Sequence, residues 1–373
     1  MSRRVSLLIF ILGLWSAVAN LAAQSPAKPS ASPAPAPSAT PQASPTPTPS
    51  TRTLIDSMDS ADLKEAIQLL KNNYIKPEAL NETELSRAAF EGILTRLGQG
   101  VILLSDSAAE PAEPAAPFYG EILDGHIAYL RLGALNRANL EALDANLQTF
   151  AAKKVDAVVL DFRASPATND FAVAAEFAKR FCPKDKPLFT LRKTTAKQER
   201  AFTSDRDPSY QGLTIVLADG DTAGAAEAVA GVIRIYDKAL IIGQQSAGRA
   251  VEYSDLKLPS GKVLRVAVGE AILPEGRPLF PGGLKPDVPV EMPAADKREI
   301  FQASRGKGMT PFVVQESRPH LNEAALISGR NPELEAMEAA QKRGRNPEKP
   351  GVHDPVLQRA LDLVTSIGIF QKK

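Results

Sequence analysis

Cysteine and histidine are scarce in this chain of 373 residues, and their scarcity excludes several kinds of site. The single cysteine, Cys182, rules out an intrachain disulfide, and its apolar neighbours favour a small buried residue over a reactive thiol. The histidines His126, His320 and His353 are far apart in the sequence, so no spacing typical of a zinc site is present. We therefore expect neither a metal nor another cofactor.

An excess of charge of either sign is also missing. The chain has 44 basic and 43 acidic residues, for a net charge of +1, which gives no reason to expect a nucleic-acid partner. Hydrophobic residues make up 44% of the chain and charged residues 23%, as in globular proteins. A peptide or another protein is the kind of partner that this composition leaves open.

The beginning of the chain has the pattern of a secretion signal. Two arginines precede the apolar run Val5–Leu14, and small residues follow it up to Ala23. This pattern favours a cleaved signal peptide over residues 1–23. The alternative is an uncleaved membrane anchor, because Val5–Ala23 approaches spanning length. Both interpretations place the protein body in the periplasm or cell envelope, and only the anchor gives it contact with a membrane.

Composition divides the rest of the chain into five segments. Residues 24–52 are rich in proline, alanine and serine and are predicted to be a disordered linker. Residues 53–104 have helical periodicity, and 105–117 form a second linker. Residues 118–293 carry the features of a folded core, and 294–373 are expected to be helical in parts.

Two helices are predicted in the segment 53–104. In the first, Asp59 or Ser60 is the cap, and apolar residues then recur every three or four positions: Leu63, Ala66, Ile67, Leu70 and Tyr74. In the second, Asn81 is followed three residues later by Glu84, which resembles a capping box.

Short apolar runs and helical stretches alternate in the core, which predicts an α/β fold. The runs fit buried strands at residues 126–132, 157–162, 213–218 and 239–243. Helical stretches separate them at 140–154 and 171–181. Residues 251–273 then indicate a hairpin with its turn near Ser260, and Asp354 with Pro355 indicates the start of a last helix.

Four stretches of the core occur in a familiar order: DAVVLDFRASP (156–166), LTIVLADGDTAGAAEAVAGVI (213–233), KALIIGQQSAGRA (238–250) and PLFPGGLKPDVPV (278–290). Their order and spacing resemble the C-terminal processing, or tail-specific, peptidases of serine peptidase family S41. The resemblance implies a crotonase- and Clp-protease-like core. It also implies a catalytic serine, a lysine that removes its proton, and backbone amides that hold the oxyanion.

This chain departs from the family at both catalytic positions. The position of the serine is occupied by Gly224, and the position of the lysine, 25 residues later, by Arg249. Glycine supplies no nucleophile, and an arginine stays protonated, so it cannot act as a general base. Glu252 and Tyr253 stand where the family places a residue that orients the lysine.

The turn that the resemblance assigns to the oxyanion hole is altered as well. Ala167 and Thr168 replace glycines of the family, and Ala225 follows the nucleophile position. Arg249 either binds an anion in the cleft or has a structural role, extending to solvent or pairing with Glu252.

Members of the family usually carry a PDZ domain, which binds substrate, between the N-terminal helices and the core. Such a domain needs roughly 80–100 residues. Only residues 98–118 separate the predicted helices from the core in this sequence, so a PDZ domain is not expected there.

Three functions fit these residues. The first is a non-hydrolytic S41 homologue, a pseudopeptidase that binds a peptide or an envelope protein. The second is an active serine peptidase with displaced catalytic groups, for which Ser165, Thr222 and Ser246 are candidate nucleophiles without a basic neighbour in sequence. The third is a structural envelope protein. Asp161 and Arg163 are expected to be structural hydrogen-bonding residues.

Overall fold

The computed structural model describes residues 50–105, 116–236, 239–313 and 352–371. The predicted signal peptide and nearly all of both predicted linkers lie outside the described residues. The chain divides into two compact units, Met1–Leu80 and Asn81–Lys373.

The described part of the first unit is helical. It consists of α1 (Thr51–Asp56), α2 (Ser60–Asn73) and the 3-10 turn η1 (Pro77–Leu80). The carboxylate of Asp59 caps α2 by accepting hydrogen bonds from the amides of Ala61 and Asp62, which confirms the predicted helix start. None of the residues of α1 and α2 is buried.

The second unit is built on a mostly parallel sheet of six strands in the order β12-β8-β7-β4-β3-β2. Its strands are β2 (Tyr119–Leu123), β3 (Ile127–Arg131), β4 (Ala157–Asp161), β7 (Leu213–Ala218), β8 (Leu240–Gly243) and β12 (Val288–Pro289). All neighbours are parallel except the edge pair β2 and β3. The four strands predicted from apolar runs are confirmed as β3, β4, β7 and β8.

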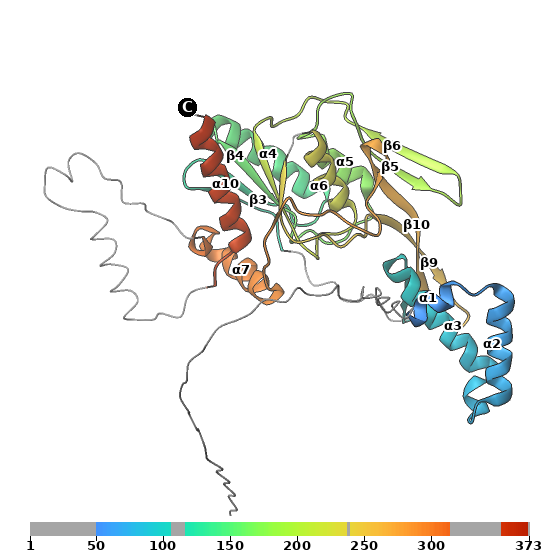
Figure 1. The fold of residues 1–373 in the computed structure, drawn as a ribbon. Coiled ribbons are helices and arrows are strands. Elements are labelled where there is room, and N and C mark those ends of the chain that lie inside the picture. Colours follow the sequence, from blue (N-terminus) through green and yellow to red (C-terminus); the bar gives the residue numbers. More distant parts are fainter. Residues whose placement is uncertain (1–49, 106–115, 237–238, 314–351, 372–373) are drawn as a thin grey trace, which may run out of the picture. The chain divides into compact units, whose positions relative to one another are not determined.

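Helices cover both faces of this sheet (Figure 1). The face that carries Val158 and Val216 packs against α4 (Arg137–Lys153), α5 (Phe171–Ala178) and α6 (Ala225–Tyr236). The opposite face, with Val159 and Ile215, packs against α7 (Ala294–Lys307) and α10 (Pro355–Gln371). Because successive side chains of a strand point to opposite faces, both faces of these apolar strands are buried, as in α/β folds.

A second, antiparallel sheet is centred on the long strand β10 (Val263–Leu273). Its other members are β1 (Val101–Leu104), β5 (Pro187–Lys193), β6 (Gln198–Thr203), β9 (Val251–Lys257) and β11 (Arg277–Pro278). The predicted hairpin 251–273 is confirmed as β9 and β10. The strands β5 and β6 were not predicted, because β6 is exposed along nearly its whole length and lacks an apolar pattern.

The remaining helices are α3 (Glu82–Leu97), which follows its predicted cap Asn81, and three short 3-10 turns. These turns are η2 (Gly98–Gly100), η3 (Pro274–Gly276) and η4 (Thr310–Phe312). The predicted last helix is confirmed as α10, with Asp354 accepting hydrogen bonds from the amides of Val356 and Leu357. Within the described part of the chain, no helix has the length and apolar character needed to cross a membrane.

Candidate functional site

Three loops meet at one edge of the parallel sheet. They follow β4, β7 and β8, and carry residues 162–170, 219–224 and 244–250. Because these strands are parallel and adjacent, their carboxyl ends lie at the same edge, which is where open α/β sheets usually bind ligands. All positions that the family resemblance assigned to catalysis lie on these loops, at the start of α6 or on β9.

Gly224 immediately precedes α6 and has a φ of +66°. A Cβ atom at this position would lie 2.9 Å from the carbonyl oxygen and 3.1 Å from the amide nitrogen of Thr168. Side chains rarely adopt this backbone conformation, and here the backbone of the 165–168 turn also fills the space. The position therefore fits glycine and has no room for a serine side chain unless the turn shifts.

The same turn engages the first amide of α6. The amide of Ala225 donates to the carbonyl oxygen of Thr168 at 3.1 Å. An oxyanion hole requires such an amide to be free to donate to the oxygen of the reacting group. In this structure the amide already has an internal acceptor.

Glu227 connects the turn at Gly224 with the loop at Arg249. Its carboxylate is fully buried and accepts four hydrogen bonds. The Oε2 atom accepts from the amides of Gly224 at 3.1 Å and Arg249 at 2.8 Å. The Oε1 atom accepts from the amide of Gly248 at 2.7 Å and the hydroxyl of Ser246 at 2.5 Å. These bonds bring the two substituted catalytic positions together on a single side chain.

Burial raises the pKa of Glu227 above its ordinary value, and the four hydrogen bonds offset the effect only in part. None of the four donors is a cation, so burial of the negative charge is compensated by dipoles alone. The sequence carries a signal for this residue. A lone acidic residue in an alanine-rich helix start, three positions after Gly224, is typical of a capping contact.

The backbone of Arg249 is fixed by two hydrogen bonds. Its amide donates to the carboxylate of Glu227, and its carbonyl oxygen accepts from the amide of Val251. The Nε atom of its side chain is buried and has no hydrogen-bond partner among the described residues. Glu252 instead forms an ion pair with Lys193 at 2.8 Å. The hydroxyl of Tyr253 donates to the carbonyl oxygen of Gln99 at 2.8 Å.

The described contacts of the candidate displaced nucleophiles include no lysine and no histidine. Thr222 donates to the carbonyl oxygen of Phe162 and accepts from the amide of Asp219, and Ser246 donates to Glu227. The Oγ atom of Ser165 is buried without a hydrogen-bond partner among the described residues. Ser246 therefore has a carboxylate within hydrogen-bond reach, but no Ser–Lys or Ser–His pair is assembled from these groups.

A second buried charge cluster lies beside the cleft and is centred on Arg163. Its guanidinium donates to Asp161 at 2.7 and 2.9 Å and to Asp354 at 2.8 and 3.0 Å. The hydroxyl of Tyr129 donates to Asp161 at 2.7 Å. Burial alone would raise the pKa of Asp161, but the adjacent guanidinium outweighs it and holds that pKa below its ordinary value. These contacts give Asp161 and Arg163 the structural role expected from the sequence.

Lys297 on α7 holds two of the cleft loops. Its buried ammonium donates to the carboxylates of Asp219 at 2.5 Å and Asp221 at 2.6 Å, and to the carbonyl oxygen of Arg163 at 3.2 Å. These three contacts engage Lys297 in ion pairs and a hydrogen bond that tie α7 to the loops. It was not predicted, since α7 is more than 70 residues away from these loops in the sequence.

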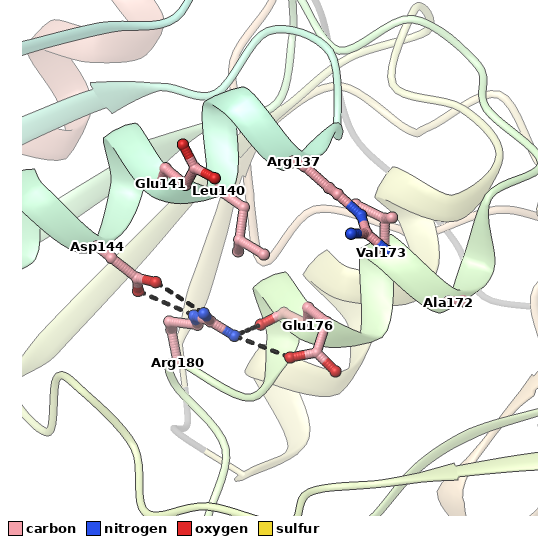
Figure 2. Close-up of a pocket in the computed structure, with 8 residues that line it drawn as sticks. All are labelled: Arg137, Leu140, Glu141, Asp144, Ala172, Val173, Glu176 and Arg180. Carbon is pink, nitrogen blue, oxygen red and sulfur yellow. Dashed lines mark hydrogen bonds and ion pairs between the residues drawn. The ribbon is translucent and has the colours of Figure 1, made fainter.

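A pocket of about 460 Å³ lies elsewhere, between α4 and α5 (Figure 2). Figure 2 shows Arg180 between Asp144 and Glu176, with which it forms hydrogen bonds and ion pairs. Arg137, Leu140 and Val173 are among the other lining residues. No residue predicted from the sequence as part of the catalytic site lines this pocket, so it is distinct from the site at Gly224 and Arg249.

Comparison with known proteins identifies the family. The model of Peptidase family S41 matches residues 126–290. This segment belongs to peptidase family S41. The match includes all three cleft loops and both substituted positions, and the fold of the segment is the α/β fold expected for it.

Two curated relatives are similar to this chain. A carboxy-terminal-processing protease of Bartonella bacilliformis is 28% identical over 190 residues, which cover 50% of this chain and 43% of the relative. The carboxy-terminal processing protease CtpA of Bacillus subtilis is 21% identical over 256 residues, 66% of this chain and 54% of the relative. The chain thus spans about half the length of the curated relatives that it matches.

Among solved structures, a photosystem II D1 C-terminal processing protease matches with a TM-score of 0.39 and 21% identity. The match covers 51% of this chain and 47% of that chain.

Proposed function

We propose that this protein is a non-hydrolytic member of family S41 that binds a peptide or a segment of another protein in the cleft at residues 224 and 249. The proposal combines a peptidase fold with a site in which glycine and arginine replace the serine and lysine of the family. The membership of segment 126–290 in the family supports a peptide as the ligand, and the substitutions support the loss of hydrolysis.

The observation that carries the loss of hydrolysis is the closure of the turn at Thr168 over Gly224. The carbonyl oxygen of Thr168 accepts from the amide of Ala225, and it also lies where a side chain at position 224 would begin. Restoring the serine would therefore leave two further requirements unmet, because the oxyanion amide stays engaged and Arg249 stays protonated.

Peptide binding is supported by the side chain of Arg249. Its Nε–H group is a buried donor that has no acceptor among the described residues, and leaving such a donor unpaired costs roughly 1–3 kcal/mol. A carbonyl or carboxylate oxygen of a bound peptide would satisfy it. Guanidinium groups bind both kinds of oxygen well because their donors are fixed in a plane.

We also propose that the protein works in the periplasm or cell envelope. The support is the signal-like pattern of residues 1–23, which lie outside the described residues. A fusion of these residues to a reporter that is active only after export tests this. An inactive reporter would contradict the proposed location.

Hydrolysis is tested with a fluorophosphonate probe and with turnover of labelled casein. We expect no labelled serine and no turnover in the wild type or in Gly224→Ser, and at most trace turnover in Gly224→Ser combined with Arg249→Lys. Labelling of any serine in the wild type, abolished by replacing that serine, would show an active peptidase and overturn the proposal.

Binding is tested by fluorescence anisotropy of labelled unfolded casein. Loss of a charged hydrogen bond predicts that Arg249→Gln weakens binding about tenfold or more. Arg137→Gln is the matched control, because it changes an exposed arginine of the separate pocket in the same way. Equal losses of affinity in both variants, or a loss only in Arg137→Gln, would contradict the proposal that the peptide binds at residues 224 and 249.

A further inference from the structure

The pocket between α4 and α5 has the size and lining of a site for a small molecule. Its volume of about 460 Å³ falls within the range of roughly 300–1,000 Å³ that is usual for such sites. Leu140, Ala172 and Val173 give it an apolar wall, and Figure 2 shows Leu140 pointing into the space between the two helices. Arg180, which is 5% exposed, adds a buried polar group. The pocket can therefore hold an apolar group next to charged ones.

Positive charge gathers at one end of this pocket. The strands β3 and β4 are parallel neighbours and lead into α4 and α5, so both helices begin at the same edge of the sheet. Arg137 is the first residue of α4, and Ala172 and Val173 lie in the first turn of α5. The start of a helix carries a partial positive charge. A guanidinium and two helix starts therefore favour an anionic group at this end.

A negative charge is available farther along α4. Asp144 and Glu176 line the pocket but are held by the guanidinium of Arg180, at 2.7 and 3.1 Å. Glu141, one turn after Arg137, is exposed and has no hydrogen bond or ion pair with any residue that the structure describes. Its carboxylate can therefore bind a cationic group.

Arg137 and Glu141 do not neutralise each other. Arg137 likewise has no hydrogen-bond or ion-pair partner among the described residues. The two are four positions apart on α4, where a cation that precedes an anion pairs less well than the reverse order. In Figure 2 the guanidinium of Arg137 extends toward α5, and the carboxylate of Glu141 lies on the other side of Leu140. Two opposite charges are thus left free beside one apolar wall.

We propose that this pocket binds a free α-amino acid with a bulky apolar side chain. Its carboxylate accepts hydrogen bonds from the guanidinium of Arg137 at the helix starts, and its ammonium donates to the carboxylate of Glu141. Its side chain packs against Leu140 and Val173. Both charged groups of the protein are exposed, so each contributes modestly and we expect a dissociation constant of about 0.01–1 mM.

This inference is separate from the proposed binding of a peptide at residues 224 and 249. An amino acid presents its ammonium and its carboxylate on one carbon atom, whereas casein carries its terminal ammonium and carboxylate at opposite ends of a long chain. Arg137→Gln is therefore expected to weaken the binding of an amino acid and to leave that of casein unchanged. Arg249→Gln should show the opposite pattern, so either proposal can fail without the other.

The first experiment is isothermal titration calorimetry of the full chain with L-leucine and three analogues, which are measured by competition. Leucinamide lacks the carboxylate, N-acetyl-leucine lacks the ammonium, and glycine lacks the apolar side chain. We expect each analogue to bind about tenfold or more weakly than leucine, since each loses a charged hydrogen bond or the apolar contact. No binding of leucine or phenylalanine up to about 10 mM, or equal affinity of leucine and any one analogue, would overturn the proposal.

The second experiment assigns each charged group of the ligand to one residue. Arg137→Gln should weaken the binding of leucine about tenfold and leave that of leucinamide unchanged. Glu141→Gln should weaken the binding of leucine and leave that of N-acetyl-leucine unchanged. Arg359→Gln and Glu291→Gln are the controls, because they change exposed residues elsewhere in the same way. Losses that do not follow this crossed pattern, or equal losses in the controls, would contradict binding in this pocket.

Discussion

Two buried carboxylate clusters lie at the edge of the parallel sheet where its strands end, and they are stabilised in opposite ways. The carboxylates of Asp161 and Asp354 share the guanidinium of Arg163. The carboxylate of Glu227 is held by three backbone amides and one hydroxyl, with no cation among its donors. The pKa of Asp161 is lowered by its cation, whereas burial raises that of Glu227.

The two clusters therefore have different roles at this edge: the Arg163 cluster stabilises the fold, and the Glu227 cluster connects the loops of the candidate site. The Arg163 cluster joins strand β4 to the last helix through full charges. The Glu227 cluster joins the two substituted catalytic positions through hydrogen bonds to the backbone. Since the neutral donors offset the cost of burying the charge only in part, Glu227 is protonated more easily than Asp161.

The largest expected effect comes from removing the cation of the first cluster. Arg163→Ala leaves Asp161 and Asp354 buried without a counter-ion, and we expect a loss of about 4 kcal/mol in the free energy of unfolding. Arg192→Ala breaks an exposed ion pair with Glu270 and should cost less than about 1 kcal/mol. Urea denaturation measures both, and similar losses would show that the Arg163 cluster does not hold the fold.

A smaller effect is expected at the closed turn of the cleft. Gly224→Ala places a Cβ atom against Thr168 at a positive φ, so we expect a loss of about 2 kcal/mol. Gly220→Ala is the control in the same loop, because no atom lies within 4 Å of its added Cβ atom, and it should change stability by less than about 0.5 kcal/mol. An unchanged free energy of unfolding in Gly224→Ala would mean that the turn at Thr168 moves away from position 224 at little cost.

The smallest expected effect is the pH dependence of the free energy of unfolding, which has opposite signs for the two clusters. The raised pKa of Glu227 means that its folded form binds the proton more tightly, so stability is lost as pH rises from the ordinary value of 4.5 through the raised pKa. The lowered pKa of Asp161 means that stability is lost as pH falls below the ordinary value of 3.8.

We therefore expect the wild type to gain stability relative to Glu227→Gln as pH is lowered to 4.5, and to lose stability relative to Asp161→Asn below 3.8. Urea denaturation at a series of pH values measures both differences. Trends of the same sign would contradict the contrast between the clusters.

The sequence alone predicted much of the core. Four of the parallel strands were found because buried strands such as β7 are continuous apolar runs, and the caps Asp59, Asn81 and Asp354 were found because capping is local chemistry. The positions Gly224 and Arg249 were found through the order of four motifs. Each strand and cap signal lies within a short stretch of chain, whereas the four motifs span residues 156–290.

What the sequence did not predict depends on contacts between distant segments. Lys297 reaches Asp219 and Asp221 only because α7 packs on the sheet. The engagement of the Ala225 amide by Thr168 depends on how two loops approach each other, which no local pattern encodes. For the same reason Glu252 was considered a partner of Arg249, whereas it pairs with Lys193 on strand β5 of the antiparallel sheet.

The contact between Arg163 and Asp354 has a consequence for the order of events during protein synthesis. The two residues are separated by 191 positions, and both side chains are buried in the finished fold. A ribosome completes strand β4 long before it makes the residue that neutralises the guanidinium beside it. The sheet cannot bury that charge at low cost until the last helix has emerged. Closure of this edge of the sheet therefore waits for a residue that is made long after the strand that it completes.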